Sequence, residues 1–141
     1  MDSKRPKVFI SHASPDSWVA RQIENHVRGC GAETFLDCEH IHHGDDFEER
    51  IIQEADESTE LLVLFTPVTR DRKYVWMEIG IFLGARKRIV GALYGVSKEE
   101  ITKDQLLPIA LKRIDSVDLN QIDSYFKQLR QRIGAPEDCN G

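Results

Sequence analysis

The sequence predicts an α/β fold in which helices cover both faces of a parallel sheet. Short runs of strand-forming residues alternate along the chain with segments whose apolar residues recur at helical spacing, which is the pattern of parallel crossovers. The run 61–65 is apolar at every position, as in strands that are covered on both faces. The length of 141 residues suits one domain and is too short for a closed α/β barrel.

The first third of the chain predicts two strands joined by a helix. Residues 7–11 form a short apolar run of strand-forming residues, and a second such run covers 33–37. Between them, Ser14 supplies a helix-capping hydroxyl and Pro15 stands at the first helical position. Apolar residues then recur at helical spacing until Gly29, where we expect the helix to end.

The middle third predicts a loop, two helices and a buried strand. A polar loop covers 38–45, and an apolar stripe of helical spacing follows over 47–55. The strand 61–65 leads into a helix over 74–88. The last three residues of that helix are basic, and we expect them to interact favourably with the helix dipole.

The last third predicts two further strands, each followed by a helix. The strands cover 89–94 and part of 112–117, and the helices cover 97–106 and 122–133. Five parallel strands in the order 2-1-3-4-5 fit this succession, which is the arrangement of a flavodoxin-like three-layer sandwich.

These elements divide the chain into a short extension over 1–6, one domain over 7–133 and a flexible tail over 134–141. In such a sheet, a ligand site lies beyond the carboxyl ends of the strands, where the strand order reverses between the first and the third strand. The side chains that follow Ile10 and Phe65 are therefore the first candidates for a site, together with those at the end of the second strand.

The balance of charges excludes several classes of partner. Lys and Arg number 19 and Asp and Glu number 24, which gives a formal net charge of −5. A negative chain matches phosphate backbones and anionic lipid poorly, so we expect no nucleic-acid or membrane partner. No apolar run approaches the roughly 18 residues of a membrane span. Three cysteines without a visible secretion signal indicate reduced thiols and a cytoplasmic protein.

Polar side chains follow the predicted strands at three places. Ser11 and His12 follow the first strand, either as a solvated turn or as groups that bind a polar ligand. Asp37 precedes a loop with three histidines, but no metal-binding spacing is present and we predict no metal site. Glu78 lies at the boundary of the apolar face of its helix, where it is either solvated, paired with an arginine or directed into the crevice.

Common catalytic motifs are missing from the sequence. It contains neither a nucleophile elbow, nor a phosphate-binding loop, nor the glycine pattern of a dinucleotide-binding turn. Phosphoreceiver domains share the predicted topology, but they need an acidic cluster after the first strand and a phosphorylatable Asp after the third. This chain has Ser11 and His12 at the first place and Thr66 and Pro67 at the second, which excludes that function.

Taken in order, these segments resemble Toll/interleukin-1 receptor (TIR) domains, particularly the bacterial ones. Residues 8–16 resemble the first motif of that family, and 62–67 resemble its third strand. Residues 35–58 are similar to the second strand, the BB loop and the helix after it. Residues 78–80 resemble the segment that carries the catalytic glutamate, and the whole resemblance covers about 6–133.

The resemblance implies cleavage of NAD⁺ at the nicotinamide–ribose bond, with NAD⁺ as substrate and no cofactor. A carboxylate must stabilise an oxocarbenium-like ribose, and the resemblance assigns this catalytic role to Glu78. Active members often carry W-x-x-x-E, whereas here Tyr74 stands four residues before the glutamate, as a substitute aromatic wall. The substrate-binding residues that the resemblance implies are Ser11, His12, Asp37, Gly44, Phe47, Tyr74 and Trp76, with the loop 39–47 as a lid.

Two classes of function remain open on this basis. The first is a TIR-type NAD⁺ glycohydrolase, ADP-ribosyl cyclase or transferase, and the second is a non-enzymatic module that assembles with itself or with other TIR domains. The carboxylate of Glu78 favours the enzyme, because a scaffold does not require it. A nucleoside-processing transferase is a third alternative, but it would show an acidic pair for the ribose that we cannot place in this sequence.

The resemblance to free-standing bacterial TIR proteins suggests a role similar to that of the TIR component of Thoeris antiphage systems. Such a protein makes ADP-ribose or a derived signal, either a cyclic isomer or an adduct, and a separate effector protein responds to it. Related sites are often completed across two subunits. We therefore expect the isolated monomer to be weakly active or silent.

Overall fold

The computed structural model describes residues 5–36, 47–104 and 114–134 of the chain. The strands are β1 (Lys7–Ser11), β2 (Glu33–Leu36), β3 (Glu60–Phe65), β4 (Arg88–Leu93) and β5 (Asp115–Asp118). The helices are α1 (Ser17–Gly29), α2 (Phe47–Glu57), α3 (Lys73–Gly84), α4 (Lys98–Lys103) and α5 (Asp123–Ile133). Short 3-10 turns are η1 (Ser14–Asp16), η2 (Thr69–Asp71) and η4 (Leu119–Gln121).

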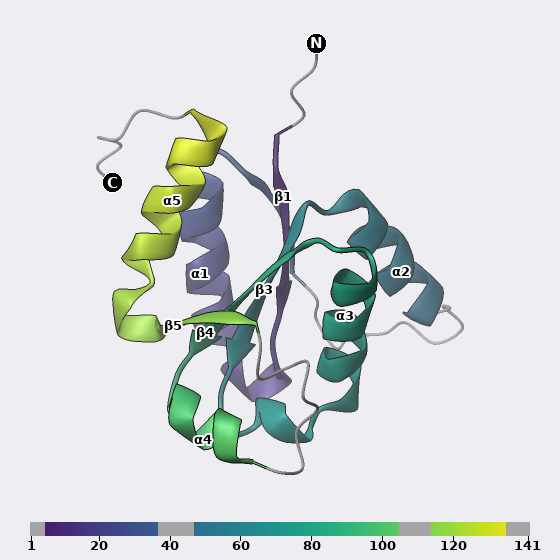
Figure 1. The fold of residues 1–141 in the computed structure, drawn as a ribbon. Coiled ribbons are helices and arrows are strands. Elements are labelled where there is room, and N and C mark those ends of the chain that lie inside the picture. The colour runs from purple at the N-terminus through teal and green to yellow at the C-terminus, as the bar shows by residue number, and fades with distance from the viewer. Residues whose placement is uncertain (1–4, 37–46, 105–113, 135–141) are drawn as a thin grey trace.

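The strands form one sheet in the order β2-β1-β3-β4-β5, and every neighbouring pair is parallel. The predicted flavodoxin-like fold is therefore confirmed. Helices α1 and α5 lie against one face of the sheet, and α2 and α3 lie against the other (Figure 1). The strand order reverses at β1, whose neighbours are β2 and β3.

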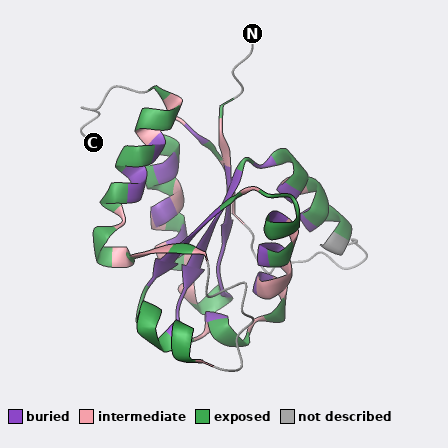
Figure 2. Ribbon diagram, in the orientation of Figure 1, coloured by how far each residue is buried: buried purple, intermediate pink, exposed green. Residues whose placement is uncertain are grey.

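The central strand β3 is buried along its whole length, and Figure 2 shows the middle of the sheet as the most buried part of the molecule. Its side chains alternate between two cores, because successive residues of a strand point to opposite faces. Leu62 and Leu64 join the core under α1 and α5, whereas Leu61 and Val63 join the core under α2 and α3. An uninterrupted apolar run thus serves two apolar layers at once.

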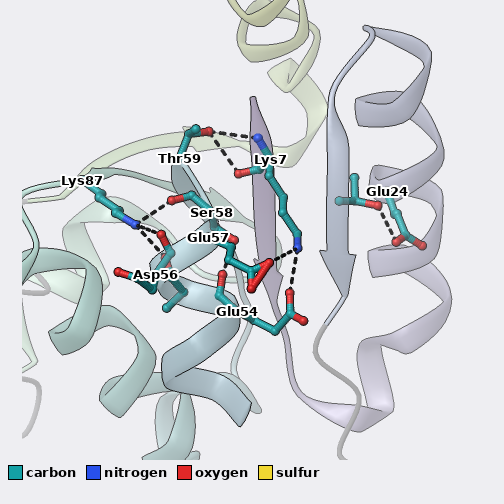
Figure 3. Close-up of polar contacts among 10 residues, drawn as sticks. Lys7, Glu24, Glu54, Asp56, Glu57, Ser58, Thr59 and Lys87 are labelled. Carbon is teal, nitrogen blue, oxygen red and sulfur yellow. Dashed lines mark hydrogen bonds and ion pairs between the residues drawn. The ribbon is translucent and has the colours of Figure 1, made fainter. Parts of the chain in front are cut away.

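Helix α3 ends at Gly84, four residues earlier than the sequence predicts, and its last turn holds no basic residue. The expected interaction of the basic residues with the helix dipole is therefore wrong. The chain turns at Arg86, which has a left-handed φ of 59°, and β4 begins at Arg88. This early turn brings Lys87 to the end of α2, where its Nζ donates to the carbonyls of Ala55, Asp56 and Ser58 at 2.8, 2.9 and 2.7 Å (Figure 3).

We expect Lys87→Met to lower the free energy of unfolding by about 2 kcal/mol, because three carbonyl groups at the end of α2 lose a charged donor. Urea unfolding of both proteins measures the difference. Lys103→Met is a matched control, since Lys103 contacts Glu99 on an exposed helix surface and its loss should cost about 0.5 kcal/mol or less. Equal losses in the two variants would contradict a capping role for Lys87.

A buried ionic cluster lies at the opposite end of β3 from the predicted site. Glu60 is 1% exposed and faces the α5 side of the sheet. Its carboxylate accepts hydrogen bonds from the Tyr125 hydroxyl at 2.6 Å and from two nitrogens of Arg132 at 2.7 and 3.1 Å. Burial, and then the negative charge of Glu60, raise the pKa of the Tyr125 hydroxyl well above its usual value. The cluster joins α5 to the centre of the sheet.

The raised pKa of Tyr125 predicts a loss of stability in alkaline solution. In the unfolded chain this tyrosine ionises above about pH 10, whereas the folded protein retains the proton. The contribution of Tyr125 to the free energy of unfolding is therefore fully present below pH 10 and falls by about 1.4 kcal/mol per pH unit above it. Urea unfolding between pH 9 and about 11 should show the wild type losing its advantage over Tyr125→Phe as the pH rises. A constant difference between the two proteins would refute the prediction.

Candidate functional site

The predicted catalytic glutamate and the polar end of β1 come together at the reversal point of the sheet. Ser11 is the last residue of β1, and its side chain faces the α3 side because it has the same parity as Phe9. Glu78 lies in the second turn of α3, which packs against that face. The Ser11 hydroxyl donates a hydrogen bond to Oε1 of Glu78, and the two oxygens are 2.5 Å apart.

Glu78 and Ser11 are both fully buried, with 0% of each exposed to solvent. The sequence places Glu78 at the boundary of the apolar face, so its complete burial is a difference from that prediction and excludes the solvated alternative. A carboxylate in such surroundings is costly to keep charged, and a hydroxyl that donates to it reduces the cost and fixes its orientation. The result is a desolvated carboxylate on α3 that is held by Ser11 at the end of β1.

His12 and Tyr74 add a second connection between β1 and α3. The Tyr74 hydroxyl donates to the main-chain carbonyl of His12 at 3.0 Å. His12 is 3% exposed, and its Nε2 lies 3.4 Å from the hydroxyl of Ser17 at the start of α1. His12 is thus packed below the surface and does not stand at the open mouth of a crevice. This hydrogen bond links Tyr74, which stands four residues before Glu78 in α3, to the residue that follows β1.

Of the other predicted site residues, Trp76 and Phe47 lie in α3 and α2, and the rest lie outside the described residues. Trp76 is half-buried and packs against the core under α2 and α3. Phe47 is the first residue of α2, and only its main chain is described. Asp37 and Gly44 lie outside the described residues, as does the loop with three histidines. Within the described ranges, no three His, Cys, Asp or Glu side chains gather in a way that could hold a metal ion.

Sequence reasoning missed a hydroxyl cluster beside the site. Thr66 and Thr69 follow β3, are 2% and 0% exposed, and lie 3.1 Å apart at their hydroxyl oxygens. Thr66 also donates to the carboxylate of Asp16 at 2.7 Å. A signal was available in the sequence, because two threonines stand three residues apart after a buried strand, and threonine side chains in such places often bond to nearby main-chain groups.

The predicted cap by Ser14 is wrong, because no side chain caps η1.

A doubly covered parallel sheet with a buried carboxylate at its reversal point defines an α/β domain whose candidate site lies at the carboxyl ends of the strands. The model of the TIR domain family matches residues 8–133, and the chain belongs to that family. In the described part of the chain, no helix is both long enough and apolar enough to cross a bilayer.

Two known proteins show what the chain is similar to. It is 27% identical, over 139 residues, to a protein of Brachypodium distachyon described as a probable 2′ cyclic ADP-D-ribose synthase, BdTIR. This alignment covers 95% of the chain and 60% of the plant protein, so the chain spans less than two thirds of that relative's length. The TIR domain of the Toll-related receptor TRR-2 from Hydra magnipapillata superposes with a TM-score of 0.65 at 20% identity, covering 87% of the chain and 97% of the receptor domain. This second likeness concerns the fold.

Proposed function

We propose that the protein cleaves the bond between nicotinamide and ribose in NAD⁺ and that Glu78 is its catalytic residue. The observation that carries the proposal is the fully buried Glu78 carboxylate, which Ser11 orients at the reversal point of the sheet. Membership of the TIR family and similarity to a probable cyclic ADP-ribose synthase support it. NAD⁺ is the substrate in this proposal, and neither a metal nor a cofactor takes part.

The chemistry requires one well-placed negative group. As the C1′–N1 bond breaks, its electron pair moves to the nicotinamide nitrogen, and nicotinamide leaves as a neutral molecule without needing a proton. The ribose that remains has oxocarbenium character, and a carboxylate close to C1′ stabilises the positive charge. A desolvated carboxylate does this more effectively than one in water, because the local dielectric constant is low. The hydrogen bond from the Ser11 hydroxyl fixes the position of the Glu78 carboxylate.

The full burial of Glu78 bears on when the site is active. A dinucleotide reaches this carboxylate only after neighbouring groups move or a second subunit remodels the site, since none of the side chain is exposed. We therefore propose that assembly with a second copy or with another TIR domain activates the protein, and that the monomer is weakly active or silent. Nicotinamide release that rises more steeply than in proportion to protein concentration would support this view.

The nucleophile that captures the ribose determines the product. Water gives ADP-ribose, a group within the same dinucleotide gives a cyclic isomer, and an external nucleophile gives an adduct, each with loss of one proton from the nucleophile. The description of the plant relative favours a cyclic ADP-ribose among these products. We further propose that the product is a signal in antiphage defence in the bacterial cytoplasm, where a separate effector protein responds to it.

The test is incubation of concentrated protein with NAD⁺, followed by chromatography and mass spectrometry of the products. We expect one nicotinamide for each ADP-ribose-derived product, and nicotinamide release about 10²–10³-fold slower with Glu78→Gln. Addition of a chelator should leave the rate unchanged, because no metal takes part. Absence of release at every protein concentration, and with phage lysate as trigger, would favour the alternative of a TIR scaffold without activity.

A further inference from the structure

Asp16 has an unusual partner for a residue at the start of a helix. It occupies the N-cap position of α1, where an aspartate normally accepts a hydrogen bond from a main-chain N–H of the first helical turn. Here its side chain makes no such bond. Its Oδ2 instead accepts from the hydroxyl of Thr66, which is 50 residues away in the sequence, at 2.7 Å. Departures from local preference of this kind are expected at functional or strained sites.

The hydrogen bonds around Thr66 fix the direction of its hydroxyl. Thr69 gives its single hydroxyl proton to the carbonyl of Leu64 at 3.0 Å and accepts from the main-chain N–H of Thr66 at 3.0 Å. The Thr66 hydroxyl accepts from the N–H of Val68 at 3.3 Å, which leaves its own proton for Asp16. Both threonines are nearly or fully buried, so these bonds compete little with water.

This bond completes a series of three between residues 11–16 and the part of the chain that runs from the end of β3 into α3. Ser11 donates to Glu78, Tyr74 donates to the carbonyl of His12, and Thr66 donates to Asp16. The first two contacts lie at the beginning of the turn, and the Asp16 contact lies at its end. Without the third bond, the end of the turn loses its side-chain contact with the end of β3, and Ser11 has more freedom to move away from Glu78.

We propose that Asp16 is a positioning residue, which holds the 11–16 turn against the end of β3 through Thr66 and so keeps the Ser11 hydroxyl on the Glu78 carboxylate. The inference rests on the proposed cleavage of NAD⁺ for its catalytic consequence. Asp16 itself stabilises no charge on the substrate. Its loss should therefore lower kcat and leave KM for NAD⁺ almost unchanged, because small misplacements of catalytic groups mainly affect the transition state.

The experiment compares Asp16→Ala, Thr66→Val and Thr66→Ser with the wild type. We expect Asp16→Ala, which removes the acceptor, and Thr66→Val, which removes the donor, to lower kcat about tenfold each, with KM changed by about twofold or less. Thr66→Ser restores the hydroxyl and should return kcat close to the wild-type value. The double variant should be no slower than either single variant, because both changes remove the same bond. Amide hydrogen exchange at residues 11–13 should become faster in both slow variants.

Thr34→Val is the matched control, because Thr34 donates to the carboxylate of Glu24 at 2.8 Å in a bond of the same kind away from the site. A fall in kcat that is equal for Thr34→Val and Thr66→Val would overturn the proposal, as would a melting-temperature loss in Thr66→Val with unchanged kcat. If the wild type releases no nicotinamide, the proposed function fails by itself. Amide exchange then decides the positioning role, and unchanged exchange at residues 11–13 in Thr66→Val would refute it.

Discussion

Glu78→Gln is expected to lower nicotinamide release about 10²–10³-fold, which is the usual effect of removing one group that stabilises transition-state charge. Glutamine keeps the size of the side chain, and its carbonyl oxygen can still accept the bond from Ser11. The negative charge opposite the ribose is lost. The folded structure should persist, since a neutral amide costs less to bury than a carboxylate.

The measurement is nicotinamide release at saturating NAD⁺, together with circular dichroism and a melting curve for each protein. Glu60→Gln is the matched control, because it makes the same chemical change at the other end of the sheet. Below its melting temperature, Glu60→Gln should retain activity. If Glu78→Gln keeps the wild-type rate while folded, the carboxylate has no catalytic role and the proposed function is wrong in its central point.

Glu60→Gln is expected to lower the free energy of unfolding by about 2–3 kcal/mol. The substitution leaves the guanidinium of Arg132 beside a neutral amide, and breaking a buried ion pair on one side typically costs about 3–5 kcal/mol. We expect a loss at or below the lower end of that range, because the Arg132 side chain is 28% exposed and can reach water. Urea unfolding at neutral pH measures the loss.

Glu99→Gln provides the comparison for an exposed ion pair. Glu99 contacts Lys103 one helical turn away, and both side chains are 74% exposed, so its loss should cost about 0.5 kcal/mol or less. A similar small cost for Glu60→Gln would mean that the buried cluster contributes little beyond its packing. The two substitutions of buried glutamates should therefore have different effects: Glu78→Gln should mainly lower activity, and Glu60→Gln should mainly lower stability.

The sequence predicts the sheet well because a strand that is buried on both faces appears in the sequence as an uninterrupted apolar run. The run 61–65 is apolar throughout, and it proved to be part of β3 at the centre of the sheet. The end of α3 could not be predicted in the same way. Three basic residues are compatible with a continuing helix, but Arg86 adopts a left-handed conformation and Lys87 binds the end of α2. The Lys87 contact depends on α2, a helix that is distant in the sequence.

The geometry of the candidate site could not be predicted for a related reason. Family resemblance singles out Glu78 as the catalytic candidate, whereas its complete burial and its bond to Ser11, which is 67 residues away, arise only when α3 packs on the sheet. The bond between Asp16 and Thr66 was missed because the local sequence around Asp16 predicts an ordinary helix start. Asp37 and Gly44 remain predictions, since they lie outside the described residues. Tertiary contacts of long range, and not local propensities, determine the details of the site.

The two outer strands of the sheet limit how copies of this chain can associate. Acidic side chains stand at Glu33 in β2 and at Asp115 and Asp118 in β5. Edge strands that carry like charges resist the addition of a further strand from another chain. A higher-order assembly of this domain should therefore grow through contacts between its helices and loops, and the sheet of each subunit should stay separate from its neighbours.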